Sequence, residues 1–353
     1  MNRFALAKSL TPIARLALLG VQFATISVFS AESPAFKPPP PPGTYLNPLG
    51  DPPIHLSEPF ILTHAKKYYL FGTAAAAEGF QCYESDDLVH WGFDGWAWRK
   101  TGLHVARGEL HSPQVFPYQT MFCLVYSARM PTGMHLGLAA SLKPEGPYHD
   151  LHVPWLTLGE GSVAGDVFVD SNGKAYLTFT QTSRRGDCNY RTVYGVGLSK
   201  DLSRMLGEPV RFLEASQRWE LAQRNSIRFN DAARMVRLGS KYYLTYCAND
   251  PQSSDCAIGY AVADKPLGPW TKGVENPIVR THPEIGVLGP CHGAVFRSLD
   301  RSGWWLVYDS LTDPTNRPED RVMNLDRLLL QGNSTIALNG PTRSPQPLLS
   351  GAK

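Results

Sequence analysis

The apolar residues of this chain gather in short stretches separated by turns, and one arrangement of them occurs five times. A polar residue precedes a short apolar strand, and after a turn a second strand follows that is rich in Tyr, Leu and Phe. The second strands are 68–72, 122–126, 175–179, 242–246 and 304–308. Their equivalent leucines recur about every 50–70 residues, which is too long for a solenoid and typical of a propeller blade with loops. The pattern therefore predicts an all-β protein, a five-bladed β-propeller.

A polar side chain heads each first strand at the same phase of the repeat. The five residues are Glu58, Gln114, Asp166, Asp231 and His292. In a propeller the N-terminal ends of the innermost strands converge near the central channel, so we expect these side chains to meet there. A β-sandwich would also alternate strands and turns, but it gives no reason for a polar residue at one phase of every repeat. We expect Val322–Leu330 to close the ring with a blade from the opposite chain end.

The composition indicates a large folded unit with few helices. Of the 353 residues, 43% are hydrophobic and 18% charged, a balance typical of a globular protein. The 31 glycines, 29 prolines and 11% aromatic residues favour short strands and turns over a helical bundle.

The first 30 residues have the order of a secretory signal peptide. They contain three basic residues and no acid, the stretch 16–28 is apolar, and Val28-Phe29-Ser30 resembles a cleavage site before Ala31. The apolar run is too short to span a bilayer, and a buried N-terminal helix is the alternative interpretation. We expect a secreted or periplasmic protein without a membrane segment once the signal is removed.

A proline run follows the signal. Prolines occupy 38–42 and precede Gly43, and such a run forms neither a helix nor a central strand. We therefore expect a Pro-rich linker at 31–46 and a propeller domain at 47–353.

The net charge of +3 comes from the leader. Because residues 1–30 hold three of the 34 basic residues and none of the acidic ones, the rest of the chain has 31 of each. No basic stripe remains to follow a phosphate backbone, so we do not expect a nucleic-acid partner.

The six cysteines are scattered and form no C-x-x-C pair, which argues against a zinc or redox motif. Cys247 and Cys256 flank a polar, turn-rich loop, and a disulfide across this hairpin is one interpretation. Free buried thiols are the other.

Three carboxylates in one pocket match the needs of glycoside hydrolysis. One activates water, a second donates a proton to the leaving oxygen, and a third orients the donor and raises its pKa by like-charge repulsion. Phosphoryl transfer would need a glycine-rich cradle with basic residues, and the sequence shows no such cradle.

On these residues the stretch 47–345 resembles family 43 glycoside hydrolases, the five-bladed propellers of the arabinanase and xylosidase clan. The resemblance implies that Glu58, before Pro59, is the general base, that Asp231 is the general acid, and that Asp166 tunes the acid. It also implies that His292, in a Pro-Cys-His-Gly segment, lies near the channel where a calcium ion is often found. Calcium prefers oxygen ligands, so we expect His292 to contact a metal-bound water.

The two main catalytic candidates depart from the family pattern. The family has Asp as base and Glu as acid, whereas this chain has Glu58 and Asp231. One methylene moves a carboxylate by about 1.5 Å, and a displacement of about 1 Å can cost about a hundredfold in rate. Two opposite exchanges roughly conserve the separation and displace the sugar, which suggests an altered substrate or linkage. Glu220 is an alternative acid.

Three other residues are candidate contacts to sugar hydroxyls. His111 and Gln114 fall at the family's second-blade motif, and Arg321 falls near an arginine that the family places over the sugar. Packing in a turn is the alternative for the first two, and a solvated loop is the alternative for Arg321.

The leading hypothesis is an exported hydrolase that cleaves a plant or algal polysaccharide or oligosaccharide with inversion. A catalytically inactive propeller that binds glycans is the second hypothesis. A protein-interaction propeller is the third, and it gives no reason for acids at the channel mouth.

Overall fold

The computed structural model describes residues 40–73, 78–100, 109–159, 161–223, 225–313, 320–332 and 334–348. It divides the chain into two units, 1–39 and 40–353, and only the second contains described residues. The expected signal peptide at 1–30, and most of the expected linker, lie outside them. Among the described residues, no helix has the length and hydrophobicity needed to cross a membrane.

Five antiparallel units of four strands make up the second unit, which confirms the predicted five-bladed propeller. Blade 1 consists of β2 (Ser57–His64), β3 (Lys67–Thr73), β4 (Gly79–Ser85) and β5 (Gly92–Arg99). Blade 2 consists of β6 (Leu110–Tyr118), β7 (Met121–Met130), β8 (Gly133–Ser141) and β9 (His149–His152). Blade 3 consists of β10 (Ser162–Val169), β11 (Ala175–Arg185), β12 (Cys188–Leu198) and β13 (Met205–Leu213).

Blades 4 and 5 complete the ring. Blade 4 consists of β14 (Ile227–Leu238), β15 (Lys241–Ala248), β16 (Ala257–Ala263) and β17 (Thr271–Lys272). Blade 5 consists of β18 (Leu288–Arg297), β19 (Trp304–Leu311), β20 (Arg321–Gln331) and β21 (Thr335–Asn339). The described helices are two short 3-10 turns, η1 (Arg218–Leu221) and η2 (Pro283–Ile285).

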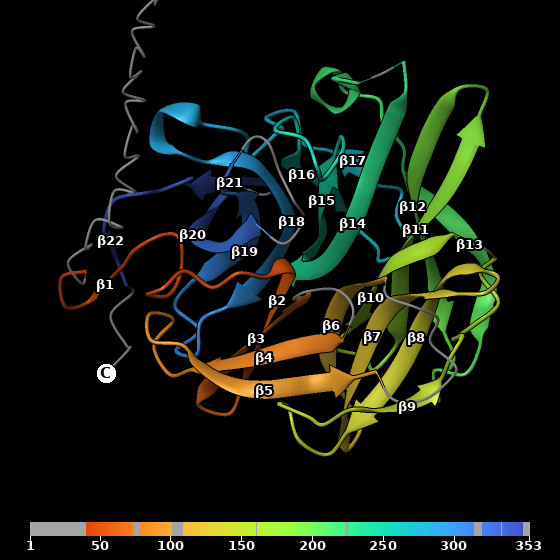
Figure 1. Ribbon diagram of the computed structural model, residues 1–353. Helices are drawn as coiled ribbons and strands as arrows, with labels where there is room; N and C mark the ends of the chain where they lie inside the picture. The colour runs from red at the N-terminus through yellow and green to blue at the C-terminus, as the bar shows by residue number, and fades with distance from the viewer. Residues whose placement is uncertain are drawn as a thin grey trace, which may run out of the picture. The chain divides into compact units, whose positions relative to one another are not determined.

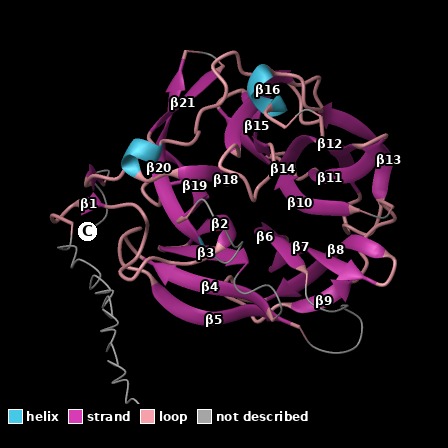
Figure 2. Cartoon of the chain, turned by 45° about the horizontal axis from the view of Figure 1, so that its top comes forward, coloured by secondary structure: helices cyan, strands magenta, loops and turns pink. Residues whose placement is uncertain are grey.

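The first strand of each blade lies nearest the centre of the ring. Figure 2 shows β2, β6, β10, β14 and β18 arranged around this centre, and Figure 1 shows the blades following one another in chain order. A short parallel pairing of Asn189–Arg191 with Ile227–Phe229 joins blades 3 and 4 into one eight-stranded sheet. The centre of the ring is therefore surrounded by segments that are far apart in the sequence.

The repeated leucines form the core of each blade. All five are fully buried on the second strand, and each pairs with an apolar residue of the innermost strand. The pairs are Ile61–Leu70, Val115–Leu124, Val167–Leu177, Met235–Leu244 and Val295–Leu306. Burying a side chain of this size stabilises the fold by about 1.5–3 kcal/mol. The same feature that reveals the repeat in the sequence therefore also holds each blade together.

The ring closes differently from our expectation. Val322–Leu330 belongs to β20, the third strand of blade 5, and the prediction that it pairs into a blade from the opposite chain end is wrong. Each blade is a contiguous segment, so no strand position is left to fill. The two ends of the described part of the chain instead pair in a small ribbon of β1 (Thr44–Tyr45) and β22 (Gln346–Pro347), with a further bridge between His55 and Val322.

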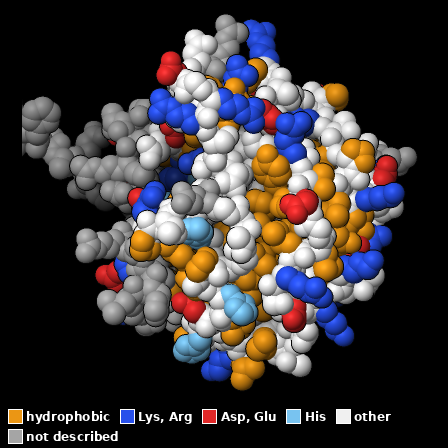
Figure 3. Space-filling model, turned by 90° about the vertical axis from the view of Figure 1, so that its right-hand side faces the viewer, with side chains coloured by type: hydrophobic (Ala, Val, Ile, Leu, Met, Phe, Trp, Pro, Cys, Tyr) orange, Lys and Arg blue, Asp and Glu red, His pale blue; other side chains and the backbone are white. Residues whose placement is uncertain are grey.

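The outer edge of blade 3 is partly apolar. Leu206 and Val210 on β13 are 56% and 45% exposed. Figure 3 views the side on which β13 lies in Figure 1 and shows hydrophobic side chains bordered by Lys and Arg. This edge is remote from the strands that line the channel.

Candidate active site

A β-bulge of the same form interrupts the innermost strand of every blade. At each bulge two residues face a single residue of the second strand, and the first of the two has a left-handed backbone with φ between 50° and 56°. These first residues are Glu58, Ser112, Ala164, Ala232 and His292. A left-handed non-glycine residue costs about 1–2 kcal/mol, and bulges commonly redirect side chains next to active sites. Strain is thus concentrated in a circle around the channel.

The bulges correct one expectation from the sequence. Only Glu58 and His292 occupy the first bulge position; Asp231 precedes it, whereas Gln114 and Asp166 follow it by two residues. The prediction that all five polar residues occupy the same position of the repeat is therefore wrong. The extra residue of a bulge changes the face of the strand on which the next side chains lie, and the hydrophobic pattern does not show where the bulge is. The five side chains nevertheless all come from the bulged parts of the innermost strands.

Glu58 has its carboxylate held by three donors. Its Oε2 accepts from the Ser112 backbone N–H at 2.6 Å and from Thr73 Oγ1 at 2.8 Å, and its Oε1 accepts from Ser112 Oγ at 2.7 Å. Burial alone would raise the pKa of Glu58, but the charge of His111, with smaller contributions from His292 and Ser112, holds it well below the usual range. The structure therefore favours an ionised carboxylate, as a general base requires.

His111 lies at the edge of this site. Its Nδ1 is 3.6 Å from Glu58 Oε2, and its side chain is 42% exposed. Burial lowers the pKa of His111, but the Glu58 carboxylate outweighs this effect and raises it. Of the three sugar contacts expected from the sequence, His111 is the one that the structure places partly exposed and beside a candidate catalytic group.

Ser112 and Thr73 did not emerge from the sequence as site residues. The signal for Ser112 was its place directly after His111, and Thr73 ends the aromatic strand β3. Each is an ordinary small polar residue, and only the neighbouring bulge brings its hydroxyl to Glu58.

Asp166 is 4% exposed and faces blade 4. Its Oδ2 accepts from the Met235 backbone N–H at 3.0 Å, and its Oδ1 is 3.8 Å from Nη1 of Arg234. Burial raises the pKa of Asp166 to about 6, although Arg234 and the Met235 N–H both lower it. Arg234, which the sequence did not single out, is thus the charged group nearest to the expected tuning residue.

Asp231 is also 4% exposed, and both carboxylate oxygens have partners. Oδ1 accepts from the Ala232 N–H at 2.7 Å, and Oδ2 forms an ion pair with Nη1 of Arg191 at 2.5 Å. Arg191 comes from blade 3, stacks over the Phe229 ring at 4.5 Å and is 30% exposed in its side chain. To donate a proton to a leaving group, Asp231 has to be released from Arg191.

The alternative acid, Glu220, lies inside blade 4. It is fully buried on η1, and its oxygens accept from Tyr246 Oη at 2.7 Å, from two backbone N–H groups and from Lys272 Nζ at 2.6 and 2.7 Å. A carboxylate with this many internal partners holds η1 against the blade. The structure therefore favours Asp231 over Glu220 as the acid.

His292 and Arg321 meet at one buried carboxylate, Asp309. His292 Nδ1 lies 2.8 Å from Asp309 Oδ2, and Arg321 Nε donates to Oδ1 at 2.7 Å. Arg321 is 3% exposed and also donates to the carbonyl oxygens of Pro251 and Gly289. These contacts favour a structural role for Arg321 over the sugar contact expected from the sequence, and they exclude a solvated loop.

Gln114 links blade 2 to blade 3. Its Nε2 donates to the Val167 carbonyl at 3.2 Å, and its Oε1 accepts from the Val167 N–H at 3.1 Å. Both polar atoms of this buried amide are therefore used within the protein, which favours a latch between blades over a sugar contact.

The disulfide differs from the one suggested by the sequence. Cys256 is bonded to Cys291, with Cα atoms 5.8 Å apart, and Cys247 is a free buried thiol. The hairpin bridge between Cys247 and Cys256 is therefore wrong. Cys256 precedes β16 of blade 4 and Cys291 lies on β18 of blade 5, so the bond joins two blades next to His292. Cys291 is 35 residues from Cys256 and lies on another blade, so the spacing of cysteines along the chain does not reveal this pair.

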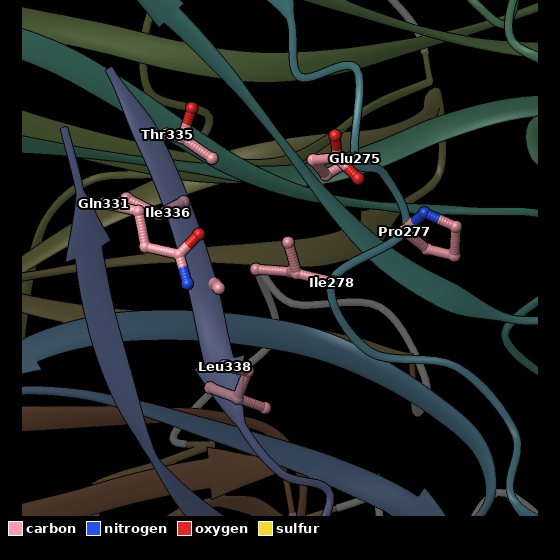
Figure 4. Close-up of a pocket in the computed structure, with 8 residues that line it drawn as sticks. Glu275, Pro277, Ile278, Gln331, Thr335, Ile336 and Leu338 are labelled. Carbon is pink, nitrogen blue, oxygen red and sulfur yellow. The ribbon is translucent and has the colours of Figure 1, made fainter. Parts of the chain in front are cut away.

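A groove outside the channel lies between blades 4 and 5. It has a volume of about 490 Å³, and Figure 4 shows Glu275, Pro277 and Ile278 facing β21 across it. No candidate catalytic residue lines this groove. The ring of bulged strands remains the candidate active site.

The structure is thus a five-bladed propeller with three carboxylates, Glu58, Asp166 and Asp231, on its innermost strands. The model of glycosyl hydrolases family 43 matches residues 46–334, and the chain belongs to this family.

Two curated glycan-degrading proteins resemble the chain. It is 30% identical to a beta-xylosidase of Xylanibacter ruminicola over 172 residues, 42% of this chain and 51% of the relative. It is 25% identical to an arabinoxylan arabinofuranohydrolase of Paenibacillus polymyxa over 360 residues, 86% of this chain and 52% of the relative. The chain thus spans about half the length of these curated relatives.

The crystal structure of a thermostable family-43 glycoside hydrolase has the same fold. It matches with a TM-score of 0.82 at 33% identity, covering 86% of this chain and 98% of the other.

Proposed function

We propose that this chain is an exported glycoside hydrolase that breaks the glycosidic bonds of pentose units, xylose or arabinose, in a plant polysaccharide. The reaction inverts the configuration at the anomeric carbon. The observation that carries the proposal is the Glu58 carboxylate on an innermost strand, which is 12% exposed, accepts hydrogen bonds from Ser112 and Thr73 and lies 3.6 Å from His111. The choice of sugar is supported by the names of the xylosidase and arabinofuranohydrolase relatives.

The reaction divides between two carboxyl groups. Glu58 takes a proton from a water molecule, whose oxygen forms the new bond to the anomeric carbon. The glycosidic C–O bond breaks at the same time, and Asp231 gives its proton to the departing oxygen. This scheme requires the two carboxyl groups to lie in the inverting range of about 6.5–9.5 Å.

Arg191 controls the availability of Asp231 in this proposal. Its side chain is 30% exposed, so the sugar can displace it from the carboxylate as it binds. Asp166 lies on β10, and burial raises its pKa to about 6. In this proposal it orients the catalytic carboxyl groups.

Export is supported by two observations of different kinds. The first 30 residues have the order of a signal peptide. The disulfide between Cys256 and Cys291 is typical of a protein that matures in an oxidising compartment.

The test is a substrate panel. Purified protein is incubated with arabinoxylan, xylan, arabinan and aryl glycosides of xylose and arabinose, and reducing ends are counted. NMR of the first product shows whether the anomeric configuration is inverted. We expect Glu58→Gln and Asp231→Asn to lose turnover, whereas Glu78→Gln, on an exposed residue of the same blade, keeps it.

An inactive glycan-binding propeller gives a different result. Such a protein is retarded by a polysaccharide in affinity electrophoresis and releases no sugar from any substrate of the panel. That outcome, or full turnover by Glu58→Gln, would reject the hydrolase proposal.

A further inference from the structure

The family resemblance predicts a calcium ion near His292, and such an ion needs free oxygen atoms around it. Calcium takes about six to eight oxygen ligands, chiefly carboxylates, carbonyls and water. The carboxylate nearest to His292 is Asp309, which is fully buried. Its Oδ1 accepts from Arg321 Nε at 2.7 Å, and its Oδ2 accepts from the Glu58 backbone N–H at 2.7 Å and contacts His292 Nδ1 at 2.8 Å.

Neighbouring carbonyl oxygens are occupied by the same cation. Arg321 donates to the Pro251 carbonyl at 2.7 Å and to the Gly289 carbonyl at 2.6 Å. The oxygens that would suit a calcium ion are thus neutralised by a guanidinium group. Among the described residues, Cys247, Cys256 and Cys291 are the one group of His, Cys, Asp and Glu side chains close enough together to hold a metal ion, and two of these form a disulfide. The donor set around His292 does not fit calcium.

A second guanidinium lies among the catalytic candidates. Arg234, directly after the bulge of β14, is 6% exposed, and its Nε and Nη1 have no hydrogen-bond partner among the described residues. Nη1 is 3.8 Å from Asp166 Oδ1, and the group lies 5.3 Å from the centre of the Phe60 ring. Burial lowers the pKa of Arg234 and outweighs the opposite effect of the Asp166, Glu58 and Asp309 carboxylates. One buried cation therefore interacts with carboxylates of blades 1, 3 and 5.

We propose that Arg234 is the resident cation of the channel and that this protein folds and acts without a divalent metal ion. In this role Arg234 is a positioning residue: it compensates the charge of Glu58 and Asp166 from a fixed point, and it repels a calcium ion that approaches the same carboxylates. The statement about activity rests on the proposed function, whereas the statement about metal binding does not.

The first experiment measures metal binding without substrate. The full-length protein is treated with EDTA, its calcium content is measured by mass spectrometry, and its thermal midpoint is compared in EDTA and in calcium chloride. We expect no stoichiometric calcium and no change of midpoint. Calcium at about a hundred times its Kd would instead raise the midpoint by about 5–10 °C, and that result, or one retained calcium ion per chain, would overturn the proposal.

The second experiment removes the charge of Arg234. We expect Arg234→Met to reduce kcat at least tenfold and to move the acidic limb of the pH profile upward, because Glu58 and Asp166 lose a cation. Arg234→Lys should restore most of the rate and the wild-type profile. Arg237→Met, on the same strand but paired with Asp170, is the matched control. Wild-type kcat and an unmoved pH profile in Arg234→Met would contradict the positioning role.

The two experiments distinguish a failure of the proposed function from a failure of the inference about Arg234. If the wild-type protein hydrolyses nothing, the proposed function fails and the calcium measurements still decide the metal question. If Arg234→Met does not fold, the comparison of wild type with Arg234→Lys decides the role: a loss of rate in EDTA that calcium restores in both proteins would overturn the proposal, and rates that EDTA leaves unchanged would support it.

Discussion

Shortening the candidate base by one methylene is the sharpest test of the site geometry. In Glu58→Asp the carboxylate withdraws by about 1.5 Å. The three donors now at 2.6, 2.7 and 2.8 Å then fall outside hydrogen-bond range. A misplacement of about 1 Å can cost about a hundredfold, so we expect kcat/KM to fall at least a hundredfold, which is about 2.7 kcal/mol of transition-state stabilisation. Folding should also weaken, because Ser112 and Thr73 lose an ionised acceptor.

The assay is the initial rate of sugar release together with a thermal melt. Glu78→Asp, on the exposed end of the same blade, is the control for the substitution itself. If the exchanged pair is compensated, Glu58→Asp combined with Asp231→Glu should recover more activity than either single change, a non-additive result. A Glu58→Asp enzyme within threefold of wild type would refute the view that Glu58 is held in place by these donors.

Three further predictions concern stability. Cys256→Ala opens a loop of sequence separation 35 and should lower the free energy of unfolding by about 4 kcal/mol in denaturant titrations, whereas Cys247→Ala, at a free cysteine, should cost clearly less. Asp166 has a folded pKa of about 6, above its usual 3.8, so it contributes stability that is present below pH 4 and lost as the pH rises to 6. In Asp166→Asn the free energy of unfolding should therefore fall by about 3 kcal/mol less between pH 4 and pH 6 than in the wild type. The two proteins are compared with each other because Asp326 titrates in the same pH range in both. Glu220→Gln should destabilise the fold by about 3 kcal/mol yet keep kcat per folded molecule, and loss of kcat with normal stability would revive Glu220 as the acid.

The fold could be predicted from the sequence because its signals are local and repeated. Each blade carries its own strand, turn and aromatic strand, with a leucine that must be buried, and five copies suffice to count the blades. Ring closure was not predictable in the same way. Val322–Leu330 has the pattern of a strand in any position, and only the assembled ring shows that blade 5 is complete without a strand from the other chain end.

The candidate catalytic residues could likewise be predicted from local patterns, but the residues that contact them could not. Glu58, Asp166 and Asp231 were identifiable because each belongs to a repeated strand, whereas their partners Ser112, Arg234 and Arg191 come from neighbouring blades.

By itself, then, the sequence determined the blades, their buried leucines and the presence of carboxylates on the innermost strands, since each of these follows from residues close together in the chain. Only the tertiary structure decided what each carboxylate touches. A bulge adds one residue without disturbing the hydrophobic alternation on either side of it, so the direction of the side chains around it cannot be read from the pattern. Contacts between blades, including the bond of Cys256 to Cys291, exist only after the ring has closed.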